Sequence, residues 1–462
     1  GGRGQWVASS VRPNGNLDDV LAFAQRDDVN VLFILVDTLR ADHLSAYGYD
    51  RDTSPNMAAL ADSGVRFARN VSQSSWTKCS MASLWTGLYP ARSRVLRAPH
   101  VISEGAEMPA EIFREAGFRT AGIWRNGWIG PDFGFGQGFQ TYTQPKPTAR
   151  NRGASRERPN IAALLGTDAD LVVSARSFLR SFADERWFLY LHMMDVHQYV
   201  YTPDEALFGN SYLDNYDNSI RWVDRLIGEL VQDLESRGLR SNTLIVLAAD
   251  HGEAFNEHGN EGHARDVYGE VTETPFILSF PFELDPGVVV ESRTANVDLW
   301  PTVFDLLGMS SQPDPDGRSR VPELIAAVNE SIEPGLKGSE DDHAGDSQLG
   351  DDEDESAIFA LLDQTWGRDR EDPAPLVAVN HGRYRLFYPS LQPERAELYD
   401  KLADPTEQHN LRSAFPEVVE NLSAIAEEHL ASPPAPWGDD APAIEMNDMQ
   451  LDQLRALGYG VE

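Results

Sequence analysis

Two places in the sequence put acidic side chains directly after an apolar run. Asp37 follows residues 29–36, and Asp250 with His251 follows residues 243–249. Continuous apolar runs bounded by polar residues are typical of strands buried on both faces of a parallel sheet, and ligands bind at the carboxyl ends of such strands. One strand-end aspartate is often only a helix cap. Two of them with an imidazole predict a divalent-metal shell, whose oxygen and nitrogen donors would suit Zn or Mn.

A third stretch, residues 75–87, could supply a nucleophile. It contains the only cysteine of the chain, Cys79, and a hydroxyl side chain two positions earlier, Thr77. A helix is predicted over Ser80–Thr86, because the following Gly87 is a common helix terminator. Thr77 would lie just before this helix, where free N–H groups attract anions, although a threonine there is most often a simple cap. Contact with the predicted metal would make its alkoxide an accessible nucleophile.

The charge of the chain is strongly negative. Lys and Arg number 39 against 73 Asp and Glu, which gives a net charge of −34 over 462 residues. Such a field repels nucleic acid and anionic membranes, so no nucleic-acid partner is expected. Adaptation to salt would explain the acid-rich, lysine-poor composition, and a general compositional bias would explain it equally well.

The lone cysteine excludes an internal disulfide. No apolar run approaches the roughly 18 residues of a membrane span, so no membrane segment is expected in this chain. The sequence begins at Gly1, and a signal or anchor could have preceded it. Compartment and oligomeric state stay open at this point.

Strands and helices alternate along the first two thirds of the chain. This alternation predicts a doubly wound α/β fold, with a large, mainly parallel sheet and helices on both faces. Strands are expected at 29–36, 120–124, 187–193, 243–249 and 275–279. Helices are expected at 17–25, 56–63, 80–86, 107–116, 168–182, 213–237 and 297–307.

The predicted regions are an N-terminal extension at 1–28, the main α/β domain at 29–310, an acidic surface loop at 311–355 and a C-terminal subdomain at 356–462. Residues 340–355 are a dense acidic run without fixed spacing, which indicates a solvated loop and not a metal cage. Residues 146–159 are expected to form a surface excursion. In the subdomain, short strands are expected at 357–362, 376–380, 384–388 and 397–399, and a final helix at 417–429. Together they predict a small antiparallel sheet with one helix.

Several long segments resemble, in order, the sulfatase family of the alkaline phosphatase superfamily. They are NVLFILVDTLRADHLSAY (30–47), SWTKCSMASLWTGLYP (75–90), LHMMDVHQY (191–199), AADHGEAFNEHGNEGH (248–263), VDLWPTVFDLLG (297–308) and ELYDKLADPTEQHNL (397–411). The resemblance covers nearly the whole chain. It implies an alkaline phosphatase-like fold, a catalytic domain at 29–310, metal-dependent cleavage of small anionic esters and, by family habit, an extracytoplasmic location.

The motif around the nucleophile departs from the family pattern. Ordinary sulfatases carry Cys-x-Pro-Ser-Arg, whose cysteine becomes formylglycine, followed by a helix that ends Leu-Leu-Thr-Gly. Counted back from Thr86-Gly87, the nucleophile position falls on Thr77, and Cys79 takes the proline place. A threonine cannot become formylglycine, and Thr38 replaces the second acid of the family's Asp-Asp pair. Threonine-type relatives that transfer or hydrolyse phosphate and phosphonate esters share both changes, so the resemblance implies a threonine-nucleophile type.

Site roles follow from the resemblance. The implied metal ligands are Asp37, Thr77, Asp250 and His251, around a divalent ion for which Zn or Mn is favoured and Ca is acceptable. His197 and His263 correspond to residues that contact the substrate's anionic oxygens or protonate the leaving group.

Further candidates have weaker support. Asn126 and Arg125 could bind substrate, with a turn beside a strand end as an equal alternative, and Lys78 could point to the site or to solvent. His192 and His258 are expected to be structural. A second metal site formed by Asp195, His197 and His263 is disfavoured, because its spacing differs from the known two-metal pattern.

The leading hypothesis is a metal-dependent hydrolase of phosphate mono- or diesters or phosphonate esters that uses Thr77. A covalent ester on threonine must be cleaved by water at its central atom, which phosphoryl chemistry permits readily. The alternatives are a sulfuric ester hydrolase, a transferase of a phospho-substituent, and a non-catalytic binding protein on a degenerate sulfatase fold.

Overall fold

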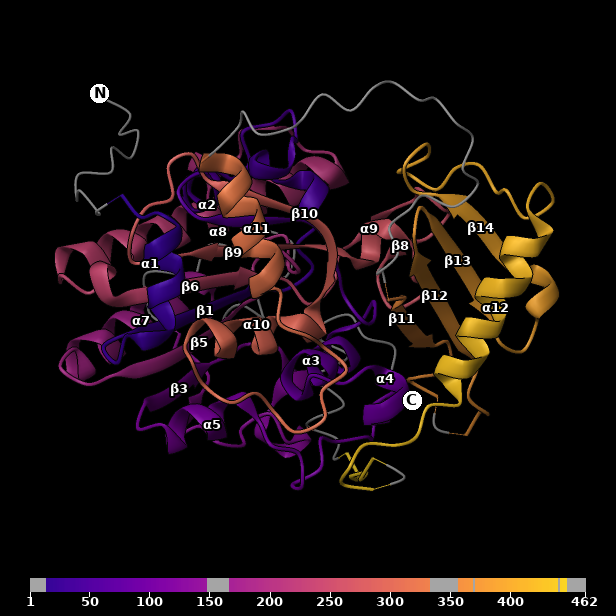
Figure 1. Ribbon diagram of the computed structural model, residues 1–462, viewed down its shortest axis with the longest axis horizontal. Coiled ribbons are helices and arrows are strands. Elements are labelled where there is room, and N and C mark those ends of the chain that lie inside the picture. Colours follow the sequence, from indigo (N-terminus) through magenta and orange to yellow (C-terminus); the bar gives the residue numbers. More distant parts are fainter. Residues whose placement is uncertain (1–13, 148–165, 333–355, 369, 439–440, 447–462) are drawn as a thin grey trace.

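The computed structural model describes residues 14–147, 166–332, 356–368, 370–438 and 441–446. These residues form a large sheet flanked by helices and, beside it, a smaller sheet that carries the last helix, as Figure 1 shows. This architecture confirms the predicted fold class. The acidic run 340–355 lies outside the described residues, as does nearly all of the predicted excursion 146–159.

The large sheet has eight strands in the order β10-β2-β9-β6-β1-β5-β3-β4. Strands β6, β1, β5, β3 and β4 are parallel to one another, and β10 is parallel to β2. Strand β9 is antiparallel to both of its neighbours, β2 and β6. Strand β1 therefore lies between two parallel partners, with its carboxyl end near the middle of the sheet edge. The bounds are β1 Asn30–Val36, β2 Val65–Val71, β3 Arg119–Ile123, β4 Thr141–Thr143, β5 Trp187–Met193, β6 Thr243–Ala248, β9 Glu273–Ser279 and β10 Val288–Ala295.

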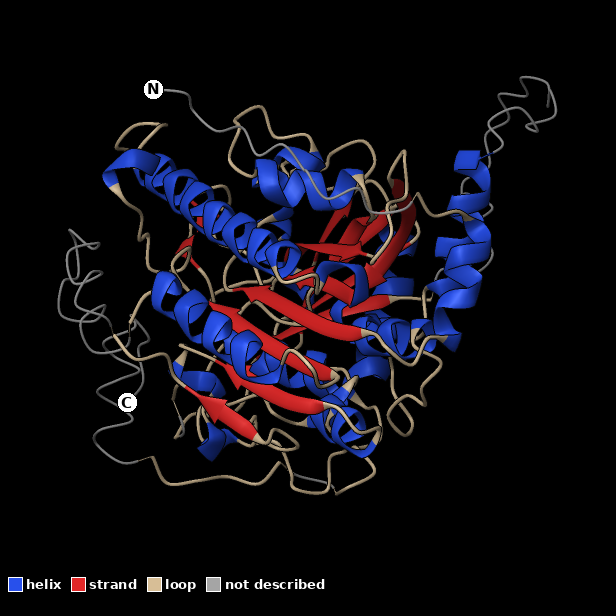
Figure 2. Cartoon of the chain, turned by 90° about the vertical axis from the view of Figure 1, so that its left-hand side faces the viewer, coloured by secondary structure: helices blue, strands red, loops and turns tan. Residues whose placement is uncertain are grey.

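Helices cover both faces of this sheet (Figure 2). Alternate side chains of β1 enter two apolar clusters, Val31, Phe33 and Leu35 in one and Leu32, Ile34 and Val36 in the other. The second cluster contains side chains of α2 Pro55–Asp62, α7 Asp168–Phe182 and α8 Tyr212–Ser236. The first contains side chains of α1 Leu17–Ala22, α3 Thr77–Thr86, α5 Pro109–Glu115, α10 Leu299–Leu306 and α11 Val321–Ile332. None of the helices in the described ranges combines the length and the apolar character needed to cross a bilayer.

The smaller sheet is antiparallel, in the order β11-β12-β13-β14, and α12 packs on it. Its elements are β11 Ile358–Asp363, β12 Pro375–His381, β13 Tyr384–Pro389, β14 Glu397–Asp400 and α12 Pro416–Leu430. Short elements complete the fold: α4 Pro90–Ser93, α9 Gly269–Thr272 and the hairpin β7 Ala254–Phe255 with β8 Glu261–Gly262.

Several elements differ from expectation, among them β2, β10 and α11. Strand β2 was not predicted, because Arg66, Arg69 and Asn70 interrupt its apolar pattern, and its edge neighbour β10 was missed with it. The expected acidic loop at 311–355 is wrong for residues 321–332, which form helix α11. Leu324 and Val328 lie four residues apart on one buried stripe of that helix, a spacing that the neighbouring acidic run obscured.

His258, between β7 and β8, links α9 to the segment that follows β14. Its Nδ1 lies 2.7 Å from Glu270 Oε1, its Nε2 lies 2.9 Å from the carbonyl oxygen of Glu407, and its ring stacks on Tyr268 at 3.8 Å. Burial alone would lower the pKa of His258, but the hydrogen bonds to Glu270 and Glu407 raise it to about 9. These contacts fit the structural role expected from the sequence.

A histidine whose pKa rises on folding stabilises the fold fully below its unfolded pKa of about 6.5, and this stabilisation is lost as the pH rises toward the folded value. We expect His258→Gln to lower the free energy of unfolding at pH 6 by about 1–2 kcal/mol, after allowance for solvent screening. The deficit should shrink by pH 9.5. Urea unfolding at several pH values measures it, with the exposed His409→Gln as control. A deficit that does not change with pH would contradict this role.

Candidate functional site

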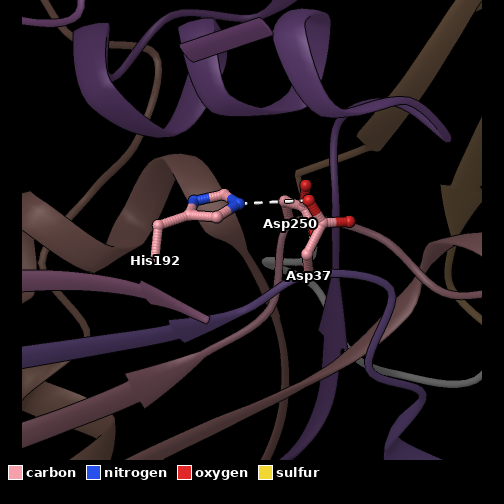
Figure 3. Close-up of side chains that lie close together, drawn as sticks. All are labelled: Asp37, His192 and Asp250. Carbon is pink, nitrogen blue, oxygen red and sulfur yellow. Dashed lines mark hydrogen bonds and ion pairs between the residues drawn. The ribbon is translucent and has the colours of Figure 1, made fainter. Parts of the chain in front are cut away.

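Asp37 and Asp250 lie side by side at the edge of the large sheet. They follow the adjacent parallel strands β1 and β6, and both side chains are fully buried. His192, in β5 on the other side of β1, turns its ring toward them (Figure 3). One ligand atom from each of these three residues lies within 4.8 Å of the others. The strand ends therefore gather two carboxylates and an imidazole, the residue types that hold Zn or Mn.

Asp37 is oriented by two donors. Its Oδ2 accepts a hydrogen bond from Asn126 Nδ2 at 2.7 Å and lies 3.1 Å from His192 Nε2. The other nitrogen of His192, Nδ1, lies 2.7 Å from the hydroxyl of Tyr190. Asp37 Oδ1 accepts no hydrogen bond from any described residue, and it lies 3.9 Å from His251 Nε2. One oxygen is thus occupied, and the other is available to a ligand.

Asp250 and His251 show the same division. Asp250 Oδ1 accepts from the backbone N–H groups of Thr38 and His251 at 3.2 and 2.9 Å, while Oδ2 accepts no hydrogen bond within the described ranges. His251 Nδ1 lies 2.9 Å from the Gly252 carbonyl, to which it must donate, so Nε2 carries a lone pair. This Nε2 lies 3.5 Å from Asp250 Oδ2. The two buried carboxylate oxygens and this nitrogen fit a divalent cation.

The turn after β1 is strained. Thr38 has φ of +60°, a left-handed conformation that is unfavourable for a β-branched residue. It is held there because its N–H donates to Asp250, its hydroxyl donates to the Asp37 carbonyl at 2.7 Å, and its own carbonyl accepts from Tyr216 at 2.7 Å. Strain that several contacts maintain is common at functional sites. Here it directs a backbone N–H at the carboxylate.

Thr77 faces the same cluster from helix α3. The helix begins at Thr77 and not at Ser80, because Trp76 takes the extended cap position. Thr77 Oγ1 lies 3.3 Å from His251 Nε2 and accepts a hydrogen bond from Asn126 Nδ2 at 3.1 Å. The structure therefore brings together Asp37, Thr77, Asp250 and His251, the four residues implied as ligands, and adds Asn126 as a shared donor.

The charges of the cluster are strongly coupled. Burial would raise the pKa of Asp37, but the imidazoles of His197 and His192 hold it below its usual range. Burial, and then the charge of Asp37, raise the pKa of Asp250 well above its usual range. Burial, and then the charge of His263, lower the pKa of His251 to about 3, so that its ring stays neutral. A cation between the two carboxylates would remove their mutual repulsion.

His263 and His197 lie next to this cluster. The ring centroids of His263 and His251 are 4.6 Å apart, and those of His197 and His263 are 5.0 Å apart. His263 Nδ1 lies 2.7 Å from Glu253 Oε2, and Tyr199 donates to the other oxygen of Glu253 at 2.9 Å. Sequence reasoning missed Glu253. In the run Asp-His-Gly-Glu it lies two residues after His251, and this closeness to a predicted ligand could have marked it as a site residue.

Other candidates have different surroundings from those expected. Arg125 is buried and pairs with Asp168 and Asp195, so it neutralises carboxylates instead of reaching the Thr77 cluster. Asp195 also accepts from Trp222 Nε1 at 2.9 Å, and with Arg125 at its other oxygen it is unsuited to a second metal site.

Lys78 is also buried, which corrects the solvent alternative. It donates to the Ala98 carbonyl and lies over the rings of Phe133 and Trp128, at 4.0 and 4.7 Å.

A doubly wound sheet that carries an Asp/Asp/His cluster at its carboxyl edge, with a small antiparallel sheet beside it, defines the alkaline phosphatase-like class of hydrolase. Residues 29–309 match the model of the sulfatase family. The chain belongs to the sulfatase family, whose enzymes are ester hydrolases that depend on a metal ion.

Named relatives span most of the chain. It is 23% identical over 493 residues to an N-acetylgalactosamine-6-O-sulfatase of Bacteroides thetaiotaomicron, covering 86% of this chain and 92% of that protein. It is 25% identical over 461 residues to a choline-sulfatase of Rhizobium meliloti, covering 83% and 82%. The crystal structure of a phosphonate monoester hydrolase of Agrobacterium radiobacter shares the fold, with a TM-score of 0.66, 19% identity and coverage of 87% and 95%.

The two imidazoles near the carboxylates can be separated by experiment. If His251 ligates the ion, His251→Ala should weaken the affinity for Mn²⁺ or Zn²⁺ by more than about 100-fold. His192→Ala removes only a donor to Asp37 and should weaken that affinity by about 10–100-fold. Metal titration after chelator treatment, with metal content measured by mass spectrometry, gives both values. The reverse order would make His192 the ligand.

Proposed function

We propose that the chain is a metal-dependent hydrolase that cleaves phosphate or phosphonate esters through a covalent intermediate on Thr77. The carrying observation is the position of the Thr77 hydroxyl. Its oxygen lies 3.3 Å from His251 Nε2, the nitrogen that also faces the available oxygens of Asp37 and Asp250. A serine or threonine hydroxyl is a weak nucleophile unless a base or a metal activates it, and this is where a metal would do so.

Cys79 supports the assignment by contrast. Its side chain is buried in the apolar cluster under α3, and burial raises the pKa of the thiol to about 12. The thiolate is the reactive form of cysteine, and it is essentially absent here at neutral pH. Of the two side chains considered for attack, Thr77 is therefore the suitable one.

The chain's own residues supply the steps. A divalent ion held by Asp37, Asp250, His251 and the Thr77 oxygen would act as a Lewis acid and lower the pKa of that hydroxyl. Thr77 Oγ1 loses its proton to solvent and attacks phosphorus in line with the ester oxygen, so that the Oγ1–P bond forms while the bond from phosphorus to the alcohol breaks. Water then attacks phosphorus and releases a proton, the Oγ1–P bond breaks, and Thr77 Oγ1 takes up a proton again.

His263 is the proposed proton donor to the leaving alcohol, with His197 beside it at the anionic oxygens. Burial would lower the pKa of His263, but the charge and hydrogen bond of Glu253 raise it, which favours the imidazolium. Glu253 also fixes the ring through Nδ1, so that Nε2 can face the substrate. This carboxylate–imidazole pair is the arrangement that general acid catalysis requires.

Sulfuric ester hydrolysis is the second candidate, and the names of the two sulfatase relatives favour it. The threonine favours phosphorus, because the covalent ester it forms must be cleaved by water at the central atom. Phosphoryl transfer and non-catalytic binding remain alternatives with their own readouts. A transferase would yield an acceptor product that carries the phospho-substituent. A non-catalytic binding protein would hold no divalent ion, and Thr77→Ala would leave every measured activity unchanged.

We expect a transient phospho-adduct on Thr77. Intact mass after rapid mixing with 4-nitrophenyl phosphate or a phosphonate ester should show it in the wild-type protein. Thr77→Ala should lack the adduct and lose about 10³-fold or more in kcat, whereas Cys79→Ala should keep it. Parallel kinetics with 4-nitrophenyl sulfate rank phosphorus against sulfur. A large preference for the sulfate ester would reverse the ranking, and an adduct elsewhere would remove Thr77 from its role.

Glu253→Gln tests the proton donor. A neutral amide cannot stabilise the imidazolium of His263, so kcat should fall about 10²-fold for alkyl esters, whose leaving groups need a proton. For 4-nitrophenyl esters, whose leaving group departs unprotonated, we expect a much smaller loss. Glu261→Gln, an exposed acid in the same loop, is the matched control. Equal losses for both ester types would assign Glu253 a purely structural role.

A further inference from the structure

An unassigned groove begins beside His263. One cavity of about 460 Å³ is lined by Ala264, Arg265, Gln364, Trp366, Gly367 and Arg368. A second cavity, of about 440 Å³, shares Arg265 and Gln364 and continues along the small sheet to Arg395. We call the two cavities together the arginine groove.

The arginine groove is joined to the candidate site at two points. Ala264 follows His263 in the chain, and its N–H donates to the carbonyl of Ser75 at 2.8 Å, two residues before Thr77. Trp366 stacks on Trp76, the residue before Thr77, with ring centroids 4.5 Å apart. Two residues of chain span at most about 7 Å, so the Cα atom of Arg265 lies close to that of His263.

The groove is basic within a very acidic protein. Within the described part of the chain, the Arg265 guanidinium makes no hydrogen bond or ion pair and is exposed. Arg368 pairs with the exposed Glu371, at 2.8 Å, and Arg395 donates to Gln392 at 2.9 Å. Exposed pairs of this kind are weak and are readily exchanged for another anion.

The two acids of the groove already have partners. Asp266 accepts from Asn260 Nδ2 at 2.8 Å, and Glu397 accepts from the hydroxyls of Tyr268 and Tyr399 at 2.8 and 2.6 Å. The lining therefore holds three arginines and two carboxylates that are turned to neighbours, and a third carboxylate, Glu371, pairs with Arg368 from outside the lining. In a protein of net charge −34, Arg265 is thus an exposed cation without an acidic partner among the described residues, next to the proposed reaction site.

We propose that the arginine groove binds a second anionic group on the non-reacting part of the substrate, and that Arg265 is its first contact. This inference rests on the proposed function for the position of the reacting ester. The preferred substrate is then an ester with at least two anionic groups, one at Thr77 and one in the groove. Arg265 can present two N–H groups to a carboxylate, sulfate or phosphate, the geometry in which guanidinium is selective.

The test uses a matched pair of esters. One is 4-nitrophenyl phenylphosphonate, and the other carries an added sulfonate on the phenyl ring that stays on phosphorus. We expect the wild-type protein to prefer the sulfonated ester in kcat/KM, and Arg265→Gln to reduce this preference about tenfold, mainly through KM. Arg318→Gln is the control, because Arg318 is also exposed but does not line the groove; unlike Arg265 it has an ion-pair partner, Glu323 at 3.1 Å.

Binding separates this inference from the proposed function. Calorimetry of both esters with Thr77→Ala, alone and combined with Arg265→Gln, measures the affinity ratio without turnover. If the wild-type protein hydrolyses neither ester but Arg265→Gln lowers the affinity ratio, the proposed function fails and the groove assignment stands. An unchanged ratio in Arg265→Gln, or an equal fall in Arg318→Gln, overturns the groove assignment.

Discussion

The burial of two carboxylates at one sheet edge is the constraint around which the site is built. Asp37 and Asp250 follow neighbouring strands in register, so the sheet holds their backbones side by side, and both side chains are fully buried. Two like charges in a buried place are costly unless a proton or a cation separates them. The opposite pKa shifts of the pair are the expression of this conflict. A divalent ion between them would resolve it, which fits the metal dependence of the family.

The surroundings leave one oxygen of each carboxylate occupied and one available. Asn126 and His192 hold one side of Asp37, while the strained Thr38 and the His251 backbone hold one side of Asp250. Each orienting group comes from a different strand end or loop, so the geometry depends on the whole sheet. Asn126 has a further effect, because the same amide also contacts Thr77. It therefore links the proposed nucleophile to the carboxylate cluster.

Much of this could be predicted from the sequence, for physical reasons. Strand-end residues such as Asp37 and Asp250 were identifiable because buried parallel strands are continuous apolar runs and their carboxyl ends share one edge. Contacts between distant loops were not identifiable. Arg125 was one candidate substrate contact because it is a cation in an acidic chain, yet Asp168 and Asp195, 43 and 70 residues away, neutralise it. Glu253 was missed because its partner, His263, meets it only when the loop folds back.

The same reasoning explains why the net charge is a poor guide to ligands. A charge of −34 suggests a protein that repels anionic esters, yet screening confines each charge to about 8–10 Å at ordinary ionic strength. What a substrate meets is therefore the local set of side chains. At the site, these are the paired carboxylates with their expected cation and the imidazoles of His197 and His263. Beside it are the exposed arginines, so an acidic exterior and an anion-binding edge are compatible in one chain.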